Sequence, residues 1–414
     1  MDTERHARRI VIVLFGAMSL GSAASIATAT VSPIAGTELS GHASWAGVPS
    51  AVVLLGTAVC SPIWGAVMDR WGRRGALAMG LLAGLIGTGL SAAALAAHSL
   101  VGFLVGLTLT GGASAALQLS RFAAAEVHPP TARARAIANV VLGGTVGAIF
   151  GPALVAPAGA AALRLGTEEL VGPFAAGILL YLLAGTVTVL WLRPDPRELG
   201  REVAARFPSS AVQGEPRSFG QVFRLPGAQV AVGAMVIGQM VMVMLMVITS
   251  LHMREHDHGL ASISAVISAH TLGMFAFSVV SGRLADRWGR GPVILLGASL
   301  LVLAGLTAPL SPDVLPLAVS LFLLGLGWNL CFVGGSSLLA DQLRPEERGR
   351  TQGFNDLLIA LGSAVGSLGS GVVFVSVGYG VMGAIGAALA LVPLTMAAVW
   401  VRSLSSQPAA IRPS

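Results

Sequence analysis

The stretch GAVMDRWGRR at residues 65–74 decides the fold, because a near copy of it follows in the second half of the chain. The copy reads GRLADRWGR at residues 282–290, so that Asp69 and Asp286 are 217 residues apart. A second repeated pattern, Pro-x-x-Arg-x-Arg, begins at Pro130 and again at Pro345, 215 residues later. Two repeats at nearly the same offset indicate an internal duplication.

The composition is that of an integral membrane protein. Of the 414 residues, 54% are hydrophobic and only 11% are charged, whereas a soluble domain carries about 25% charged residues. A membrane span needs roughly 20 apolar residues, and twelve segments meet that requirement. The predicted spans are 10–32, 45–67, 76–97, 100–123, 137–160, 171–192, 227–251, 261–282, 292–309, 314–339, 353–377 and 381–401.

The duplication divides these spans into two sets of six. We expect an N-terminal six-helix half at 1–192, a cytoplasmic linker rich in Arg, Pro and Glu at 193–225, and a C-terminal six-helix half at 226–414. The basic first ten residues precede an apolar run of about 20 residues without a clear cleavage site. This pattern predicts a retained first span and not a cleaved signal peptide.

The basic residues are all arginines, and nearly all of them fall at one set of loops and at the two termini. By the positive-inside rule, the N- and C-termini are predicted to be cytoplasmic. The pI of about 10.8 then reflects orientation in the membrane, and we expect no nucleic-acid partner. The two cysteines, Cys60 and Cys331, lie within predicted spans and imply no disulfide framework.

The repeated loops resemble the G-x-x-x-D-R-x-G-R-R signature of the major facilitator superfamily. The resemblance implies an all-α integral membrane fold of twelve transmembrane helices in two six-helix pseudo-repeats, working as a secondary transporter by alternating access. An aspartate between basic residues can form charge-assisted bonds to helix ends and so hold one conformer of such a transporter. The residues assigned to this conformational latch are Asp69, Arg70, Arg73, Asp286, Arg287 and Arg290.

The fifth predicted span contains Gly143-x-x-x-Gly147-x-x-x-Gly151, which resembles the glycine motif of the superfamily's antiporters. Glycines at this spacing predict the close approach of a neighbouring helix. The Gly-Gly pair that usually closes the motif is replaced by Val155-Ala156.

Charged groups within the predicted spans are few. Antiporters of the superfamily usually carry an arginine early in span four, where this chain has Gly106; Arg121 lies about four turns away and is expected to pair with Glu126. The absence of an acidic residue at mid-depth in any predicted span weakens the case for a proton-coupled drug exporter.

Two residue pairs in neighbouring spans suggest a substrate: Met242-x-x-x-Met246 and His270-x-x-x-Met274. Residues four apart on a helix lie on the same face. Three thioethers and one imidazole would suit Cu(I). With the outer turn at 252–260, Met242 and His270 are each about nine residues, or roughly 14 Å, from the outer surface.

Both pairs have simpler interpretations. Methionine is a common apolar gap-filler, and His270 would be a neutral core histidine if it bonded another helix, for example through Asn329 or Gln239. Span seven also carries Met240 and Met244 on another face. We favour the face of Met242 and Met246 for the transport pathway, because it also bears Gln239 and Met235.

The predicted outer turn is dense in metal-binding residue types. Its side chains could collect a metal ion before transport, or they could form a solvated loop. The candidates for collection are His252, Met253, His256 and His258.

The Met and His pairs resemble those of a narrower family, the CcoA-like (CalT) bacterial copper importers. That resemblance implies copper import across the bacterial cytoplasmic membrane, with copper as substrate and no resident cofactor. Related members that lack the pairs are thought to move riboflavin. The alternatives are therefore a transporter of a small organic compound, by riboflavin-like uptake or multidrug efflux, and a non-transporting sensor. The chain has no nucleotide-binding motif, and we expect a monomer that is not an enzyme.

Overall fold

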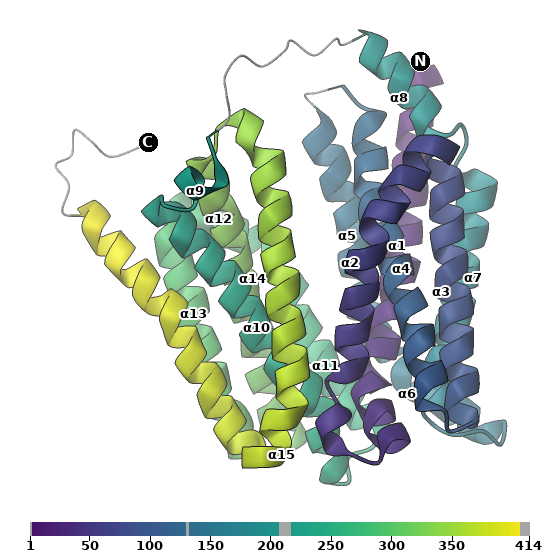
Figure 1. Cartoon of the computed structure of the whole chain (residues 1–414), viewed down its shortest axis with the longest axis vertical. Helices are drawn as coiled ribbons and strands as arrows, with labels where there is room; N and C mark the ends of the chain where they lie inside the picture. The colour runs from purple at the N-terminus through teal and green to yellow at the C-terminus, as the bar shows by residue number, and fades with distance from the viewer. Residues whose placement is uncertain (1, 130–131, 207–216, 406–414) are drawn as a thin grey trace. The chain divides into compact units, whose positions relative to one another are not determined.

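The computed structural model describes residues 2–129, 132–206 and 217–405, and within these ranges the chain is helical and contains no β-strand (Figure 1). The contacts divide the chain into two compact units. Unit 1 comprises Met1–Ala211 and Gly259–Ser264, and unit 2 comprises Val212–His258 and Ala265–Ser414. The change from one unit to the other after Ala211 falls inside the segment predicted as a linker.

Unit 1 consists of long apolar helices joined by short ones. They are α1 (Asp2–Ser40), η1 (Ala43–Trp45), α2 (Val48–Trp71), α3 (Arg73–Ala96), α4 (Leu100–Glu126), α5 (Arg133–Ala153), α6 (Val155–Arg164), α7 (Val171–Trp191) and α8 (Pro196–Arg206). The first of these is longer than the predicted span 10–32, so that α1 continues beyond the apolar run at both ends.

Unit 2 repeats this plan, although the first residues of its helix α11 group with unit 1. The elements are α9 (Phe219–Val222), α10 (Pro226–Glu255), α11 (Leu260–Phe275), α12 (Ser278–Trp288), α13 (Arg290–Thr307), η3 (Ala308–Leu310), α14 (Val314–Gln342) and α15 (Pro345–Ser405). The predicted linker contains two short helices, α8 of unit 1 and α9 of unit 2.

Eleven helical segments of the described chain are long and apolar enough to cross a membrane. The last, Thr351–Ser403, has 53 residues, and a single span needs roughly 20. It is interrupted at Gly378, whose φ of 76° and ψ of 173° are not helical, and it therefore holds the last two predicted spans. The prediction of an all-α fold with about twelve transmembrane helices is confirmed, and the chain is a multi-pass membrane protein.

Two predicted spans are broken helices. The segment predicted as 137–160 divides into α5 and α6, because Pro157 has no N–H for the carbonyl of Ala153 and its ring clashes with that carbonyl; α5 ends at Ala153. The segment predicted as 261–282 divides into α11 and α12 between Phe275 and Ser278. A side chain from another helix, described below, occupies this second break.

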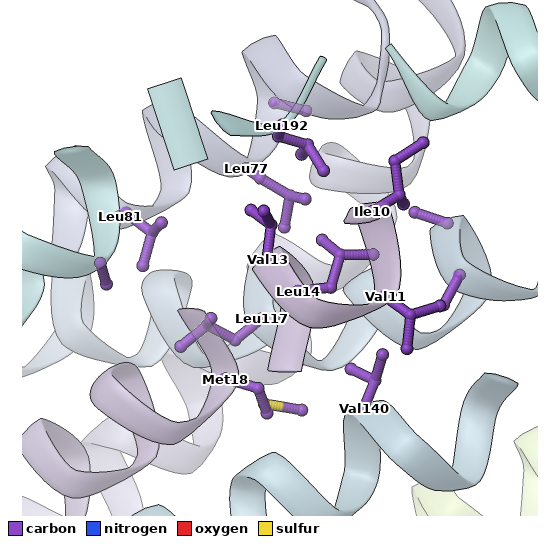
Figure 2. Packing of buried hydrophobic residues seen from close by; sticks show 14 of the residues in the cluster. Ile10, Val11, Val13, Leu14, Met18, Leu77, Leu81, Leu117, Val140 and Leu192 are labelled. Carbon is purple, nitrogen blue, oxygen red and sulfur yellow. The ribbon is translucent and has the colours of Figure 1, made fainter. Parts of the chain in front are cut away.

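The core of unit 1 is a cluster of aliphatic side chains between its long helices. Figure 2 shows Ile10 and Leu14 of α1 beside Leu77, Leu117 and Val140, from α3, α4 and α5; all five are buried. The side chains on the outside of these helices do not contribute to the core, yet many of them are also large and apolar. Helices that are apolar on all sides are typical of membrane spans.

The glycine motif of α5 lies directly against the backbone of α1. A Cβ atom added to Gly143 or Gly147 would collide with the carbonyl oxygens of Phe15 and Ser19, respectively. The predicted close approach at these small residues is confirmed. It packs α5 against α1, the helix that contributes Ile10 and Leu14 to the core of unit 1.

Candidate functional site

The packing of α10 against its neighbours determines which of its side chains are available to a substrate. Met240 packs against Gly362 and Gly366 of α15, and the Cε atom of Met244 lies beside Gly386 of the same helix. Another face, marked by Gly238, lies against α14. Met240 and Met244 are thus packing residues, as predicted from the more polar character of the other face.

The methionines predicted to share the pathway-facing side are not equally accessible. Met242 is 3% exposed, whereas Met246 is half-buried, like Gln239 and Val243 on the adjoining face. Residues four apart differ by about 40° around a helix. This difference is enough to bury Met242 against adjacent helices while Met246 stays on the same half-buried side as Gln239 and Val243.

The contacts with α14 fix the depth of each predicted ligand within unit 2. Gly238 of α10 lies beside Cys331 of α14, and Gly227 beside Gln342, so the two helices are antiparallel. The His270 imidazole of α11 bonds Leu321 and its backbone carbonyl lies beside Gly325, so His270 is six to ten residues, or about 9–15 Å, from Cys331 along α14.

Met242 is one turn beyond Gly238, or about 6 Å, and Met246 is a further turn along, at about 12 Å. Met246 therefore lies within the level of His270, and Met242 lies about 3–9 Å from it. The shared depth expected for Met242 and His270 stays a prediction.

His270 is fully buried and has one hydrogen bond. Its Nδ1 atom lies 2.9 Å from the carbonyl oxygen of Leu321, and because a carbonyl only accepts, Nδ1 carries the proton. Nε2 then has a lone pair, and this buried atom has no hydrogen-bond partner in the described part of the chain. The bond to another helix agrees with the simpler interpretation of a neutral core histidine, but the partner is neither Asn329 nor Gln239, whose side chains bond elsewhere.

Asn329 of α14 occupies the break between α11 and α12. Its Nδ2 atom donates to the carbonyl of Met274 at 2.6 Å and to Ser278 Oγ at 2.8 Å. Its Oδ1 atom accepts from Ser281 Oγ at 2.5 Å. Backbone groups freed by a break inside a membrane must find such partners, so Asn329 stabilises an irregular segment at the depth where transporters bind their substrates.

A group of aromatic and amide side chains lies next to this break. Trp328 Nε1 donates to Gln239 Oε1 at 2.5 Å. The Trp328 ring stacks on Phe332, with 5.1 Å between centroids, and Phe275 meets it edge-on at 6.1 Å. We call these four residues, all half-buried, the aromatic–amide group.

The aromatic–amide group is on a half-buried face of α14. Trp328 and Phe332 are one turn apart, between the face that Cys331 presents to α10 and the face that Gly325 presents to α11. Sequence reasoning overlooked this group, although a Trp-Asn pair in the middle of a predicted span was a visible signal.

A second polar contact continues the site by one turn of α10. The sulfur of Met235 accepts from Ser336 Oγ at 3.3 Å and from Asn355 Nδ2 at 3.7 Å. Asn355 is buried in α15, and its Oδ1 atom has no hydrogen-bond partner among the described residues. An unpaired buried acceptor costs free energy, which a donor group on a substrate would recover.

The repeated loops carry matching ion pairs. In unit 1, Arg73 bonds Asp69 at 2.8 Å and Glu126 at 2.5 Å. In unit 2, Arg290 bonds Asp286 at 3.1 Å and Asp341 at 3.1 Å. Each arginine follows a glycine with positive φ, Gly72 at 89° and Gly289 at 91°, a conformation that glycine adopts at little cost.

Comparison with known proteins identifies the architecture. The sequence profile of the Major Facilitator Superfamily matches residues 13–255 and 230–414. The chain belongs to the major facilitator superfamily. Members are transporters, and the chain is accordingly a transporter and not an enzyme.

Relatives within the superfamily span nearly the whole chain. An uncharacterized transporter of Bacillus subtilis, YdeG, is 34% identical over 95% of this chain and 92% of its own length. A second one, YddS, is 33% identical over 94% of this chain and 88% of its own. The riboflavin transporter RfnT of Brucella anthropi is 30% identical, with 87% of each chain covered.

Solved structures share the superfamily fold at low sequence identity. The nucleoside transporter NupG matches 94% of this chain and 98% of its own with a TM-score of 0.65 and 15% identity. The human organic anion transporter MFSD10 matches 94% of this chain and 99% of its own with a TM-score of 0.63 and 18% identity.

Two other members of the predicted latch, Arg70 and Arg287, have exposed side chains. The carbonyl of Arg70 accepts from Arg197 Nη1 at 3.2 Å. The ion pairs of the superfamily signature are therefore made by Arg73 and Arg290, and the latch function of the loops stays a prediction. The expected pair of Arg121 with Glu126 was wrong, because Glu126 binds Arg73; the Arg121 guanidinium lies 5.0 Å from the centre of the Phe122 ring.

The predicted outer turn is shorter than expected, because α10 continues to Glu255 and includes His252 and Met253. Met253 is fully buried, and the His252 ring stacks on Tyr379 with 4.2 Å between centroids. His258 Nε2 lies 2.9 Å from the Pro312 carbonyl. In the described ranges, no three His, Cys, Asp or Glu side chains are grouped to hold a metal, so the structure does not assemble His252, His256 and His258 into a collecting site.

Proposed function

We propose that this transporter carries a small planar organic compound, which it binds at the aromatic–amide group. The observation that carries this proposal is the hydrogen bond between Trp328 and Gln239, next to the stacked ring of Phe332. Substrate sites for small organic molecules are mostly apolar and aromatic, with a few polar groups that fix orientation. An offset-stacked ring and one amide provide both for a flat heterocycle.

The relatives support a flavin-like substrate. RfnT, which covers 87% of this chain, is named for riboflavin, a flat heterocycle that both stacks and forms hydrogen bonds. The unpaired Oδ1 atom of Asn355 would accept from a ring N–H or a hydroxyl group. Copper import, the reading favoured by the Met and His pairs, has no comparable support among these relatives.

The test is uptake of radiolabelled riboflavin by cells that neither make nor import it, with and without this protein. We expect accumulation several-fold above the empty vector. Trp328→Leu should raise KM by about two- to tenfold, since an aromatic pair contributes roughly 0.5–1.5 kcal/mol beyond its buried area. Trp45→Leu, at an exposed tryptophan outside the latch loops, is the matched control. Vector-level accumulation by protein that reaches the membrane would refute a flavin-like substrate.

A second candidate, Cu(I), is favoured by one observation at His270. A histidine that donates Nδ1–H to a backbone carbonyl, as His270 does to Leu321, has the arrangement usual for a metal ligand. Its unpaired Nε2 atom lies near the level of Met246, and soft sulfur and imidazole donors suit Cu(I).

The copper candidate has its own measurement, radiocopper uptake with and without excess Ag(I). We expect Met246→Leu and His270→Ala to abolish any uptake that silver inhibits, while Met240→Leu and Met244→Leu preserve it. Equal uptake by the parent and by His270→Ala would exclude His270 as a ligand. Riboflavin uptake without copper uptake would show that the transporter carries the organic compound and not copper.

We further propose that the protein is a monomer in the bacterial cytoplasmic membrane, with both termini in the cytoplasm. The orientation is supported by the distribution of the arginines, which follows the positive-inside rule. A fusion of alkaline phosphatase, active only outside the cytoplasm, to the C-terminus should be inactive, and a fluorescent protein fused there should fluoresce. An active phosphatase fusion would show that the C-terminus lies outside the cytoplasm, opposite to the proposed topology.

A further inference from the structure

A groove between α1 and α7 of unit 1 has a basic end and an apolar floor. Its volume is about 560 Å³, and its basic end is formed by Arg5, Arg8 and Arg9. Since residues three and four apart lie on one face of a helix, these arginines form a single stripe on α1. Ile12 and Gly16 continue the same stripe along the floor, opposite Trp191 of α7.

The three arginines concentrate charge that the protein does not neutralise. All three side chains are exposed, and none of them takes part in the ion pairs found in the described part of the chain. Like charges one turn apart on a helix destabilise each other, so an anion bound between them would be stabilising.

The floor of the groove requires an occupant that is also apolar. Ile12 is 60% exposed and Trp191 is 48% exposed, and Trp191 ends its helix, where tryptophan commonly marks the membrane interface. A free inorganic anion would leave this apolar surface uncovered. A phospholipid would place its phosphate at the arginines and an acyl chain along the floor.

We infer that this groove is a binding site for an anionic phospholipid, with the phosphate held by Arg5, Arg8 and Arg9. The predicted orientation places it in the cytoplasmic leaflet, where anionic lipids attract basic residues. The site is separate from the proposed substrate site and does not depend on the identity of the substrate.

A neighbouring groove provides an internal comparison. It lies between α3 and α7, has a volume of about 430 Å³, and includes Leu82 and Gly185. Arg74, one turn before its lining residue Ala78, donates to the carbonyl of Val189 at 2.6 Å. No charged side chain of the described chain lines this second groove, so it should not select anionic lipids.

The first experiment measures lipid selectivity by native mass spectrometry of the purified full chain in equal amounts of phosphatidylglycerol and phosphatidylcholine. We expect the parent to retain phosphatidylglycerol at least about tenfold more, because each arginine near a membrane surface contributes roughly a fivefold factor. The triple variant Arg5→Gln, Arg8→Gln, Arg9→Gln should lose most of this preference. Changing three other exposed arginines to Gln, Arg201, Arg224 and Arg283, should preserve it.

The second experiment fills the groove without changing its charge. A Cβ atom at Gly16 would have no neighbour within 4 Å, so Gly16→Leu should fold and occupy the acyl-chain floor. It should lower retention of phosphatidylglycerol at least about threefold, whereas Gly185→Leu in the second groove should not. Parental retention by Gly16→Leu, equal losses in the two arginine triples, or release of the lipid by millimolar inorganic phosphate would each overturn the lipid site.

Discussion

Arg73 and Arg290 occupy equivalent positions 217 residues apart, and each connects an aspartate one turn before it to an acidic residue of another helix. The two connections are not equally strong. Arg73 binds Glu126 through two bonds of 3.0 and 2.5 Å, whereas Arg290 binds Asp341 through one bond of 3.1 Å. Bidentate pairs of arginine with a carboxylate are both stronger and more specific in geometry, so the loop of unit 1 is held more firmly.

Unit 1 also fixes its loop through a third acidic residue. Both carboxylate oxygens of Asp195 accept from backbone N–H groups at the start of α3, those of Arg73 and Arg74, each at 3.1 Å. These N–H groups have no partner within the helix. A carboxylate at a helix N-terminus is also favoured by the helix dipole. The two copies of one sequence motif therefore differ in how tightly each is fixed.

This difference predicts unequal effects of neutralising the acids around Arg73. Glu126→Gln should lower the maximum transport rate more than Asp69→Asn, because Asp69 is exposed and exposed ion pairs contribute only about 0.2–1 kcal/mol. Substrate affinity should change little in either variant, since a loop that biases a conformational equilibrium does not touch the substrate. The measurement is transport rate and equilibrium binding of the same preparations. A large loss of affinity with an unchanged rate would contradict the latch function.

The contact of α5 with α1 predicts a sharp difference between two neighbouring glycines. Gly147→Ala would push a methyl group into the carbonyl of Ser19, whereas a Cβ atom at Gly144 has its nearest neighbours at 3.5 Å. Overpacking of this kind costs about 1–3 kcal/mol. We expect Gly147→Ala to lower the thermal unfolding midpoint in detergent and Gly144→Ala to leave it nearly unchanged. Equal midpoints for the two variants would show that the helices separate without cost.

The sequence predicted those features that depend on local composition. Apolar runs predicted the spans, and the repeated Asp-Arg loops predicted the two matching ion pairs. The spacing of Gly143, Gly147 and Gly151 predicted the contact between helices. Each of these signals lies within one segment of the chain, so that no knowledge of another helix is needed to read it.

The depth of the proposed ligands could not be predicted in the same way. Counting residues from the outer turn assumed that α10 ends before His252, but it continues to Glu255. The register of α10 against α14 is set by small residues such as Gly238 meeting Cys331, a contact between segments far apart in sequence. The partner of Trp328 depends on that register, and the partner of His270 depends on the register of α11 against α14, so both were missed.

The two faces of α10 predict different accessibility to water-soluble reagents. In a chain with Cys60 and Cys331 changed to Ser, we expect Met246→Cys to react with a hydrophilic maleimide and Met244→Cys to react at least about tenfold more slowly. The reason is that Met246 is half-buried, whereas Met244 is 5% exposed and packs beside Gly386. Faster labelling at Met244→Cys would contradict the assigned orientation of the helix.

The broken helix predicts a large effect at Asn329. Asn329→Leu keeps the side-chain size but removes the bonds to the Met274 carbonyl and the Ser281 hydroxyl, whereas Ser278 keeps its bond to the Phe275 carbonyl. An unsatisfied buried polar group costs about 1–3 kcal/mol, so the unfolding midpoint should fall well below that of the parent. Ser299→Ala, at an exposed hydroxyl that bonds only its own helix, is the control. Equal stability of the two variants would mean that the break needs no side-chain partner.

The last prediction concerns pH and the buried carboxylate of Glu347, which lies before the membrane-spanning part of α15. Arg217 binds it through Nε at 2.9 Å and Nη2 at 2.7 Å. The hydrogen bonds from Arg217 lower the pKa of Glu347 from 4.5 to about 2. Because the folded-state pKa is depressed, the pair stabilises the fold fully above pH 4.5, and this contribution is lost as the pH falls from 4.5 towards 2.

Glu347→Gln cannot form the ion pair at any pH, so its deficit in the thermal unfolding midpoint should be largest near pH 7 and should shrink below pH 4.5. Glu198→Gln, at an exposed glutamate of α8, should show no such pattern. The measurement is the midpoint of parent and variants in detergent from pH 7 to pH 3. A deficit that stays constant over this range would show that the lost stability comes from packing and not from the charge on Glu347.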